Sequence, residues 1–307
     1  MVDVYLWMYH EDLWLEFYRL LYPIKDKIIL HLATCEDNIS LDMIKHITNK
    51  FPHCNITRHR NAGGDILPFI TDFTNNPNKQ NLFMKLHTKK SKLKNKIEWR
   101  NILLHSLIGK HGQSFYSNIK YLQEHPDIGL ITNWGLLFQN EERSNTDKIN
   151  EILQYYDIPR DSIKKKKFAA GTMFIGRSSI YSKFLNSNSL DYLTPKLLEE
   201  TGHVTDSREG KYCHSLERMF GYLCEFDNYK TASCIYPTIR IINTKTPIRR
   251  LHLSITYSGF VFLEENLFIH GKLLDKFKNT FTIEWHHLPK SYIRTYTKLD
   301  RNLYIGQ

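Results

Sequence analysis

RNAGGDILPFITDFTNNPNKQNLFMKLHTKKS, residues 60–91, is the stretch from which both the fold and the site are predicted. It opens with a turn at Asn61–Asp65, whose two glycines can take positive φ and let another molecule approach the backbone. We expect a helix next, because a carboxylate such as Asp65 is favoured near a helix N-terminus. The apolar run 81–84 then predicts a short buried strand.

The seven residues after this strand, Lys85–Ser91, carry three lysines, one histidine and two hydroxyl groups. A strand that ends in such a cluster places cationic and hydroxyl donors at the carboxyl edge of a sheet, where open α/β folds bind ligands. These donors suit phosphate or pyrophosphate. A solvated basic loop is the alternative, because charge runs commonly face water. The residue types alone leave both interpretations open.

The order of elements around this stretch predicts an α/β fold. Four strands are expected at 2–9, 27–33, 55–58 and 81–84, and they alternate with helices at 13–22, after Ser40 and after the glycine turn. This β-α-β-α-β-α-β order predicts a mostly parallel sheet with helices on both faces. We expect an α/β domain over 1–235 and a less defined C-terminal extension over 236–307, packed on it as a possible membrane or partner surface.

Bulk composition favours a globular protein with anionic partners. The 307 residues are 41% hydrophobic and 24% charged, and 42 lysines and arginines against 32 acidic residues give a net charge of +10. No apolar run reaches the ~20 residues that span a bilayer, and the N-terminus lacks a signal pattern. The five cysteines are odd in number and match no zinc spacing, so we expect reduced thiols and a cytoplasmic protein.

Two further segments carry candidate chemistry. The run Lys164–Lys167 could contact anionic lipid or could be a solvated loop. It leads into 168–177, where small residues precede an apolar strand and indicate either a ligand close to the backbone or a tightly packed core. In a helix expected after Gly210, His214, Glu217 and Arg218 share one face. They form either an acid/base pair or a structural ion-pair cluster.

In their order and spacing, these motifs resemble the rhamnan synthesis protein F family of bacterial polysaccharide glycosyltransferases. The resemblance spans about Val2 to Tyr229 and depends most on the Lys85–Ser91 block. One departure is Glu209-Gly210, where the family more often has Asp-Gly. The layout also resembles the A-type nucleotide-sugar fold, in which a metal-binding Asp-x-Asp stands where this chain has Lys85–Lys89.

The resemblance implies a role for each motif. Glu217 is the candidate general base, with His214 as its alternative. Asp65 either helps to form the donor pocket or only caps its helix. The expected phosphate-binding residues are Lys85, His87, Thr88, Lys89, Lys90, Ser91 and Arg100, and the expected donor-pocket residues are Asn61, Gly63, Gly64, Asp65, Gly171 and Thr172. Because cations replace the Asp-x-Asp, we expect transfer without a metal or other cofactor, although a divalent cation is not excluded.

The resulting hypothesis is a glycosyltransferase, a hexosyl- or pentosyltransferase of capsule, O-antigen or wall polysaccharide. Its donor would be a nucleotide sugar such as dTDP-rhamnose, or phosphoribosyl diphosphate, and its acceptor a lipid-linked or free glycan. It would be cytoplasmic, with attachment to the inner face of the membrane as an option. The alternatives are a basic nucleic-acid-binding protein, for which we find no motif, and a non-catalytic scaffold of polysaccharide assembly.

Overall fold

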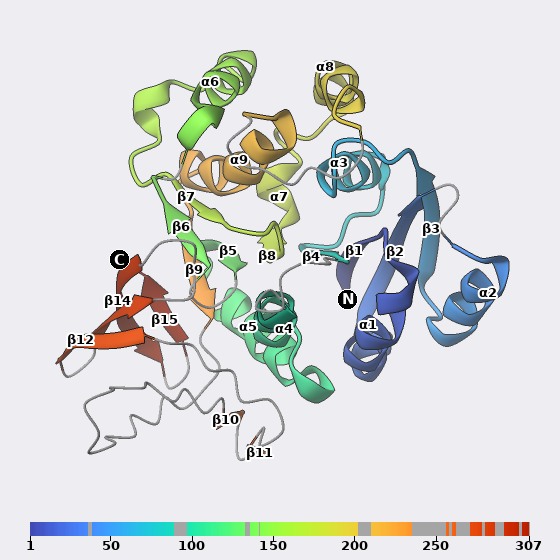
Figure 1. Ribbon diagram of the computed structural model, residues 1–307, viewed down its shortest axis with the longest axis horizontal. Coiled ribbons are helices and arrows are strands. Elements are labelled where there is room, and N and C mark those ends of the chain that lie inside the picture. The colour runs from blue at the N-terminus through green and yellow to red at the C-terminus, as the bar shows by residue number, and fades with distance from the viewer. Residues whose placement is uncertain are drawn as a thin grey trace. The chain divides into compact units, whose positions relative to one another are not determined.

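The computed structural model divides the chain into two compact units, Met1–Thr231 and Ala232–Gln307. It describes residues 1–35, 39–88, 97–132, 136–140, 142–201 and 210–234, together with short strands between 256 and 306. Figure 1 shows these elements. The candidate residues named from the sequence all belong to the first unit.

The first unit is built on one mixed sheet with the strand order β5-β8-β4-β1-β2-β3. β1 pairs in parallel with β2 and β4, and β2 pairs in parallel with β3, whereas β8 runs antiparallel to both β4 and β5. The strands are β1 (Val2–Met8), β2 (Ile28–Cys35), β3 (Cys54–His59), β4 (Leu82–His87), β5 (Ile128–Thr132) and β8 (Phe174–Arg177). A further strand, β9 (Lys230–Cys234), includes the boundary between the two units. The predicted α/β class with a mostly parallel sheet is confirmed.

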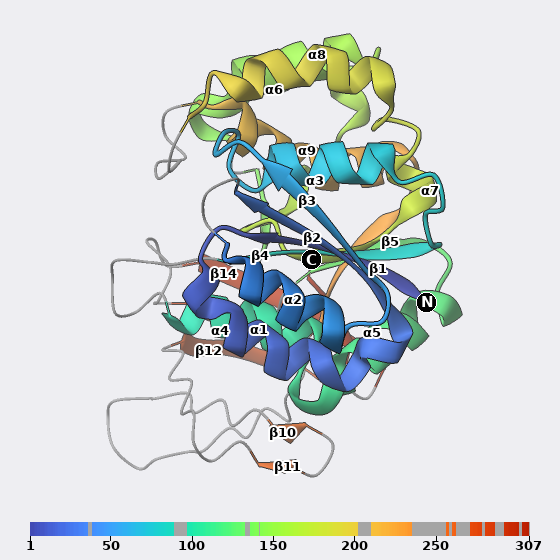
Figure 2. The same ribbon diagram turned by 90° about the vertical axis from the view of Figure 1, so that its right-hand side faces the viewer.

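Helices cover both faces of this sheet, as predicted (Figure 2). On one face lie α1 (Trp14–Leu21), α2 (Leu41–Lys50), α4 (Ile97–Leu107) and α5 (Gln113–Glu124). On the other lie α3 (Ile66–Asn75), α6 (Thr146–Tyr155), α7 (Ser178–Tyr181), α8 (Ser187–Leu198) and α9 (Tyr212–Phe226). Short 3₁₀ turns occur at Glu11–Leu13, Tyr22–Lys27, Lys110–Gly112, Arg143–Asn145 and Arg160–Ser162.

Local capping explains where two of these helices begin. The hydroxyl of Ser40 accepts a hydrogen bond from the amide of Met43 at 3.2 Å, so Ser40 is the N-cap of α2, as expected. α8 begins with a reciprocal capping box between Asn186 and Ser189.

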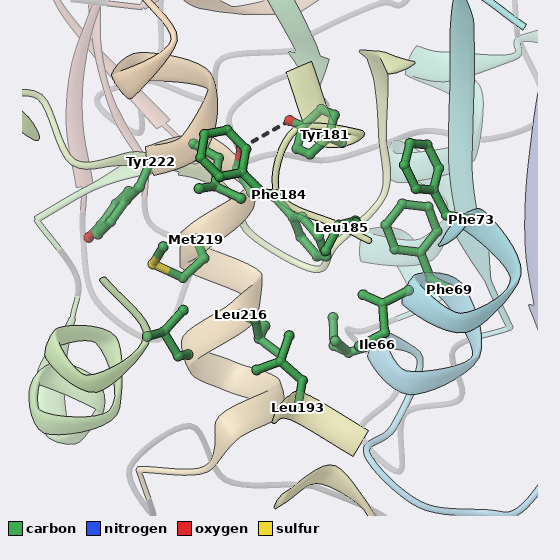
Figure 3. Packing of buried hydrophobic residues seen from close by; sticks show 14 of the residues in the cluster. Ile66, Phe69, Phe73, Tyr181, Phe184, Leu185, Leu193, Leu216, Met219 and Tyr222 are labelled. Atoms are coloured by element: carbon green, nitrogen blue, oxygen red, sulfur yellow. Dashed lines mark hydrogen bonds between the residues drawn. The ribbon is translucent and has the colours of Figure 1, made fainter. Parts of the chain in front are cut away.

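The main core lies between the sheet and the helices α3, α8 and α9 (Figure 3). Apolar side chains at helical spacing point into it, including Ile66, Phe69 and Phe73 of α3. The hydroxyl of Tyr181 is buried among them and donates to the carbonyl oxygen of Phe220 at 2.9 Å. This packing holds α3 and α9 together. Asp65 directly precedes α3, and α9 carries His214 and Glu217.

One local prediction needs correction. β4 continues through Lys85 to His87, so the first part of the basic run belongs to a buried strand and not to a loop. In the segment 168–177, small residues precede an apolar strand as expected: β7 (Lys167–Ala169) pairs with β6 (Leu137–Gln139), and β8 begins at Phe174. α6 begins at Thr146, and its apolar residues follow a helical period.

The second unit contains an antiparallel arrangement of β12 (Gly271–Phe277), β13 (Thr280–Trp285), β14 (Tyr292–Asp300) and β15 (Leu303–Gly306). β10 (Thr256–Tyr257) and β11 (Phe260–Val261) form a separate pair. Among the helices that the structure describes, none combines the length and apolar character needed to cross a bilayer.

Candidate functional site

The strand order places a topological switch point between β1 and β4. From β1 the chain moves through β2 to β3 on one side and then returns to place β4 on the other side of β1. Ligands of open α/β sheets bind outside the carboxyl ends of the strands at such a point. In this protein, His87 and Thr88 lie at the end of β4, and Tyr9 and His10 follow β1.

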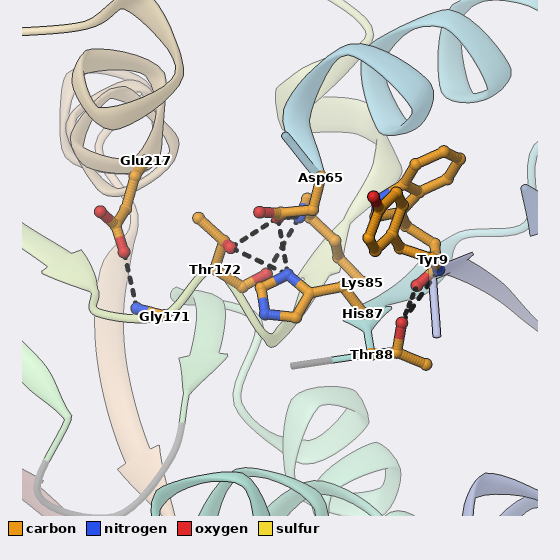
Figure 4. A network of polar contacts seen from close by, with 9 residues as sticks. Tyr9, Asp65, Lys85, His87, Thr88, Gly171, Thr172 and Glu217 are labelled. Carbon is orange, nitrogen blue, oxygen red and sulfur yellow. Dashed lines mark hydrogen bonds and ion pairs between the residues drawn. The ribbon is translucent and has the colours of Figure 1, made fainter. Parts of the chain in front are cut away.

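A buried polar cluster lies at this edge of the sheet (Figure 4). Its centre is the Oδ2 atom of Asp65, which accepts hydrogen bonds from Lys85 Nζ, from Thr172 Oγ1 at 2.6 Å and from His87 Nδ1 at 2.9 Å. Lys85 Nζ also donates to the carbonyl oxygen of Thr172 at 3.2 Å. Within the described part of the chain all three side-chain donors reach Oδ2, so Oδ1 is the oxygen left for a ligand.

The cluster keeps Asp65 ionised. Burial by itself would raise the pKa of Asp65, but the charges of His87 and Lys85 and their hydrogen bonds hold it well below its ordinary value. The Lys85 side chain is 1% exposed and that of Asp65 is 22% exposed, so the lysine is internal and the aspartate side chain is partly exposed. Asp65 makes no side-chain cap for α3, so the interpretation that it only caps this helix is wrong.

A strained turn connects this cluster to α9. Gly171 and Thr172 have φ of +88° and +52°, and the second value is unusual for a β-branched residue. The amide of Gly171 donates to Glu217 Oε1 at 2.6 Å, while the next residue, Thr172, donates to Asp65. The turn therefore brings the glycine-turn motif, the β4 motif and the α9 motif to one place (Figure 4).

On α9, Arg218 and His214 flank Glu217. Arg218 Nη1 lies 3.2 Å from Glu217 Oε2 and donates to the carbonyl oxygen of His214 at 2.6 Å, and its guanidinium stacks over the ring of Phe168. Burial lowers the pKa of His214, although the charge of Glu217 opposes this shift. The imidazole of His214 is therefore neutral at neutral pH.

An open hollow of about 750 Å³, here called the edge cavity, lies at the carboxyl ends of β1 and β2. It is lined by Tyr9, His10, Glu11, Asp12, Ile39, Ser40 and Met43. Thr88 joins it to β4, because its hydroxyl accepts hydrogen bonds from the amides of Tyr9 at 2.9 Å and His10 at 3.0 Å. The Tyr9 hydroxyl in turn accepts one from the side-chain amide of Asn61 at 3.3 Å.

The structure also shows the surroundings of three other residues predicted from the sequence, Gly63, Gly64 and Arg100. Gly63 and Gly64 have φ of +61° and +58°, and a side chain at Gly63 would press against Leu197. Arg100 makes a two-pronged ion pair with Glu16 at 3.0 and 2.7 Å, so a phosphate role for Arg100 would have to compete with Glu16. Lys89, Lys90, Ser91 and Glu209 lie outside the described residues.

Among the residues that the structure describes, no three histidine, cysteine or acidic side chains lie close enough together to bind a metal ion.

Comparison with known proteins identifies the family of this chain. The family model described as Rhamnan synthesis protein F matches residues 1–229. The chain belongs to the rhamnan synthesis protein F family. The matched span of this family member includes every residue discussed above for the candidate site, from Tyr9 to Arg218. No curated protein and no solved structure matched the chain. The resemblance predicted from the sequence motifs is thereby confirmed, together with a place in polysaccharide synthesis.

Sequence reasoning missed the edge cavity and the orientation of His87 by Asp65 in this family member. The cavity had a weak signal, since Tyr9–Asp12 directly follow the first strand. The Asp65–His87 contact had none, because 22 positions of the chain separate the two residues and only the strand order brings them together.

Proposed function

We propose that this protein is a glycosyltransferase that moves a sugar from a phosphate-activated donor to a growing bacterial surface polysaccharide. The observation that carries the proposal is the Gly171–Thr172 turn, which joins the Asp65 cluster to Glu217 at the ligand-binding edge of the sheet. Membership of a polysaccharide-synthesis family supports the same reaction class.

The charges along the edge favour one placement of the donor. Glu11 and Asp12 line the edge cavity and would repel phosphate, whereas their oxygens can accept hydrogen bonds from hydroxyl or ring N–H groups. We therefore assign the edge cavity to the nucleoside and the β4 side to the diphosphate. The cavity has the size of a small-molecule site. This assignment favours a nucleotide sugar such as dTDP-rhamnose over phosphoribosyl diphosphate, which has no nucleoside to fill the cavity.

The leaving diphosphate is stabilised in this proposal by cations of the chain itself. Asp65 orients the imidazole of His87 by accepting a hydrogen bond from Nδ1, and Lys89 and Lys90 follow His87 in the sequence. Lys85 has a different role from the one predicted: it binds Asp65 and orients this carboxylate. The Oδ1 atom of Asp65, to which no side-chain donor of the described residues is bound, accepts a sugar hydroxyl in this proposal. Fixed donors of this kind stabilise the charge that develops on a leaving group, which supports a proposed step without a metal.

Glu217 is the proposed general base. The acceptor hydroxyl attacks C1 of the donor sugar, the bond from C1 to the diphosphate oxygen breaks, and the hydroxyl proton passes to the Glu217 carboxylate. Gly171 and Arg218 fix the orientation of that carboxylate. The neutral imidazole of His214 is the alternative base, since it can also accept a proton.

A lipid-linked acceptor would require the protein to contact a membrane. The lysine run Lys164–Lys167 could form this contact. Glu225 in the last turn of α9 accepts hydrogen bonds from the successive amides of Lys164, Lys165 and Lys166, at 2.9, 2.6 and 3.1 Å. The side chains of Lys164 and Lys165 are exposed. The proposed partner is the anionic inner face of the cell membrane, and the proposed localisation is cytoplasmic and peripheral.

The experiment is a donor screen with the purified full chain. Release of the leaving group is measured with dTDP-rhamnose, other nucleotide sugars and phosphoribosyl diphosphate, each with EDTA and with added magnesium or manganese. We expect turnover of a nucleotide sugar that persists in EDTA. Activity that EDTA abolishes and metal restores would contradict the metal-independent step, while leaving the transferase assignment intact.

Two outcomes would overturn the assignment itself. Salt-sensitive binding of DNA or RNA without turnover of any donor would favour the nucleic-acid-binding alternative. Binding of a nucleotide sugar without its hydrolysis or transfer, even with acceptor glycan present, would favour the non-catalytic scaffold.

A further inference from the structure

We infer that Glu200, directly after α8, is a positioning residue that ties the glycine turn to the helix carrying Glu217. The inference rests on the proposed function, because it gives Glu200 a part in placing the proposed base. Neither motif reasoning nor family membership points to this residue, since it lies in none of the motifs discussed above.

The main chain of Glu200 holds the glycine turn. Its carbonyl oxygen accepts a hydrogen bond from the amide of Gly63 at 2.9 Å, and the next residue, Thr201, forms a β-bridge with Ala62. The turn also packs against α8, where a side chain at Gly63 would lie 2.9 Å from Leu197 Cβ. The end of α8 therefore determines where the turn before Asp65 lies.

The side chain of Glu200 holds the beginning of α9. One carboxylate oxygen accepts from the amide of Tyr212 and the other from the amide of Cys213 at 3.0 Å. The N-cap residue of α9, Lys211, supplies no side-chain cap. Glu200 therefore serves as a cap from outside the helix, and its negative charge is favoured at a helix N-terminus.

The two contacts of Glu200 are separable by mutation. Replacing the side chain removes the cap of α9 and leaves the main-chain bond to Gly63 in place. Cys213 lies four residues before Glu217, so the capped first turn supports the turn that presents the carboxylate to Gly171. Loss of the side chain should therefore disturb Glu217 more than the donor pocket.

The test is the steady-state kinetics of Glu200→Ala. We expect kcat to fall about tenfold, with KM for the donor within about twofold of wild type, because the uncapped helix populates geometries in which Glu217 is misplaced. A tenfold change corresponds to about 1.4 kcal/mol, which is comparable to the stabilisation from a helix cap. Glu200→Gln keeps one acceptor oxygen and should recover part of the lost kcat.

The matched control is Asn186→Ala, which removes the capping box at the opposite end of α8. It should lower the melting temperature by a similar amount and leave kcat unchanged. A wild-type kcat in Glu200→Ala, or equal losses of kcat in both variants, would overturn the inference.

A second readout separates this inference from the proposed function. Hydrogen exchange at the Gly171 amide, which Glu217 protects, should be faster in Glu200→Ala and unchanged in Asn186→Ala. If the wild type turns over no donor, the proposed function fails, and exchange still decides the link between Glu200 and Glu217. Unchanged exchange in Glu200→Ala would exclude that link.

Discussion

At the scale of single residues, the contact between Lys85 and Asp65 is the main departure from what the basic run implied. A lysine in KLHTKKS is expected to face an anionic ligand, but Lys85 lies within β4 and is covered on all sides. An internal ammonium group requires a partner, which Asp65 supplies. The glycine turn and β4 therefore depend on each other through one ion pair.

We predict that Asp65→Asn lowers the free energy of unfolding by about 3 kcal/mol, because it leaves Lys85 buried without its counter-charge. Denaturant unfolding at neutral pH measures the loss. The double variant Asp65→Asn with Lys85→Met should recover most of the stability while remaining inactive, because no carboxylate is left for the donor. A stable Asp65→Asn single variant would contradict the buried-pair account.

The same ion pair predicts how stability depends on pH. The pKa of Asp65 is lower in the folded than in the unfolded protein, so folding releases a proton in acid. The stabilisation is complete above about pH 4, the ordinary value for aspartate, and is lost as pH falls through the lower folded value. Unfolding curves between pH 7 and pH 3 should show this component in the wild type and not in Asp65→Asn.

Replacement of Glu217 tests the base. In Glu217→Gln the amide oxygen can still accept from Gly171, so the turn is preserved while the proton acceptor is lost. We expect kcat to fall by about 10² to 10⁴, with little change in KM for the donor. Turnover near the wild-type rate in a normally folded variant would remove Glu217 from this role and leave His214 as the candidate.

At the scale of elements, the packing of α9 against β7 determines where the Gly171–Thr172 turn lies. The two elements approach so closely that a methyl group at Gly221 would overlap the main-chain oxygen of Lys167. β7 leads directly into the turn, and α9 carries the carboxylate that binds it. Any displacement between them therefore changes the distance between the Asp65 cluster and Glu217.

We predict that Gly221→Ala reduces both stability and kcat, because α9 must move away from β7 to admit the methyl group. The expected cost is about 1 to 3 kcal/mol in denaturant unfolding, as for other overpacked sites. Gly64→Ala is the matched control: it has open space around its Cβ, so its cost comes from backbone strain alone. A Gly221→Ala protein as stable as wild type would contradict the close packing.

At the scale of the whole molecule, the net charge of +10 predicts attraction to anionic surfaces that weakens with salt. Lys164→Gln with Lys165→Gln lowers the charge to +8 and should weaken binding to vesicles containing phosphatidylglycerol. Two lysines near such a surface contribute about 2 kcal/mol, so binding should weaken by about thirtyfold in cosedimentation.

The matched control is Lys45→Gln with Lys50→Gln, which removes the same charge from exposed positions on α2. This control should weaken binding to the vesicles much less than the double variant at Lys164 and Lys165. Equal effects of the two double variants would indicate general attraction and not a specific contact at the lysine run, and absence of wild-type binding would exclude the membrane partner.

Much of the fold could be predicted from local patterns. Short apolar runs, the N-cap at Ser40 and the glycine turn indicate the alternation of β1 to β4 with α1 to α3. The family could be recognised too, because its motifs are contiguous. The beginning of α6 has no comparable local signal, because its first residues are polar.

The amino-acid sequence by itself determined the α/β class, the family and the residue types available for chemistry, since each of these depends on neighbours along the chain. Only the tertiary structure decided that Lys85 is internal, that Asp65 holds both Lys85 and His87, and that Gly171 and Thr172 stand between this cluster and Glu217. These contacts join residues separated by 20 to 107 positions in the chain. They depend on strand order and helix packing, which no local pattern encodes.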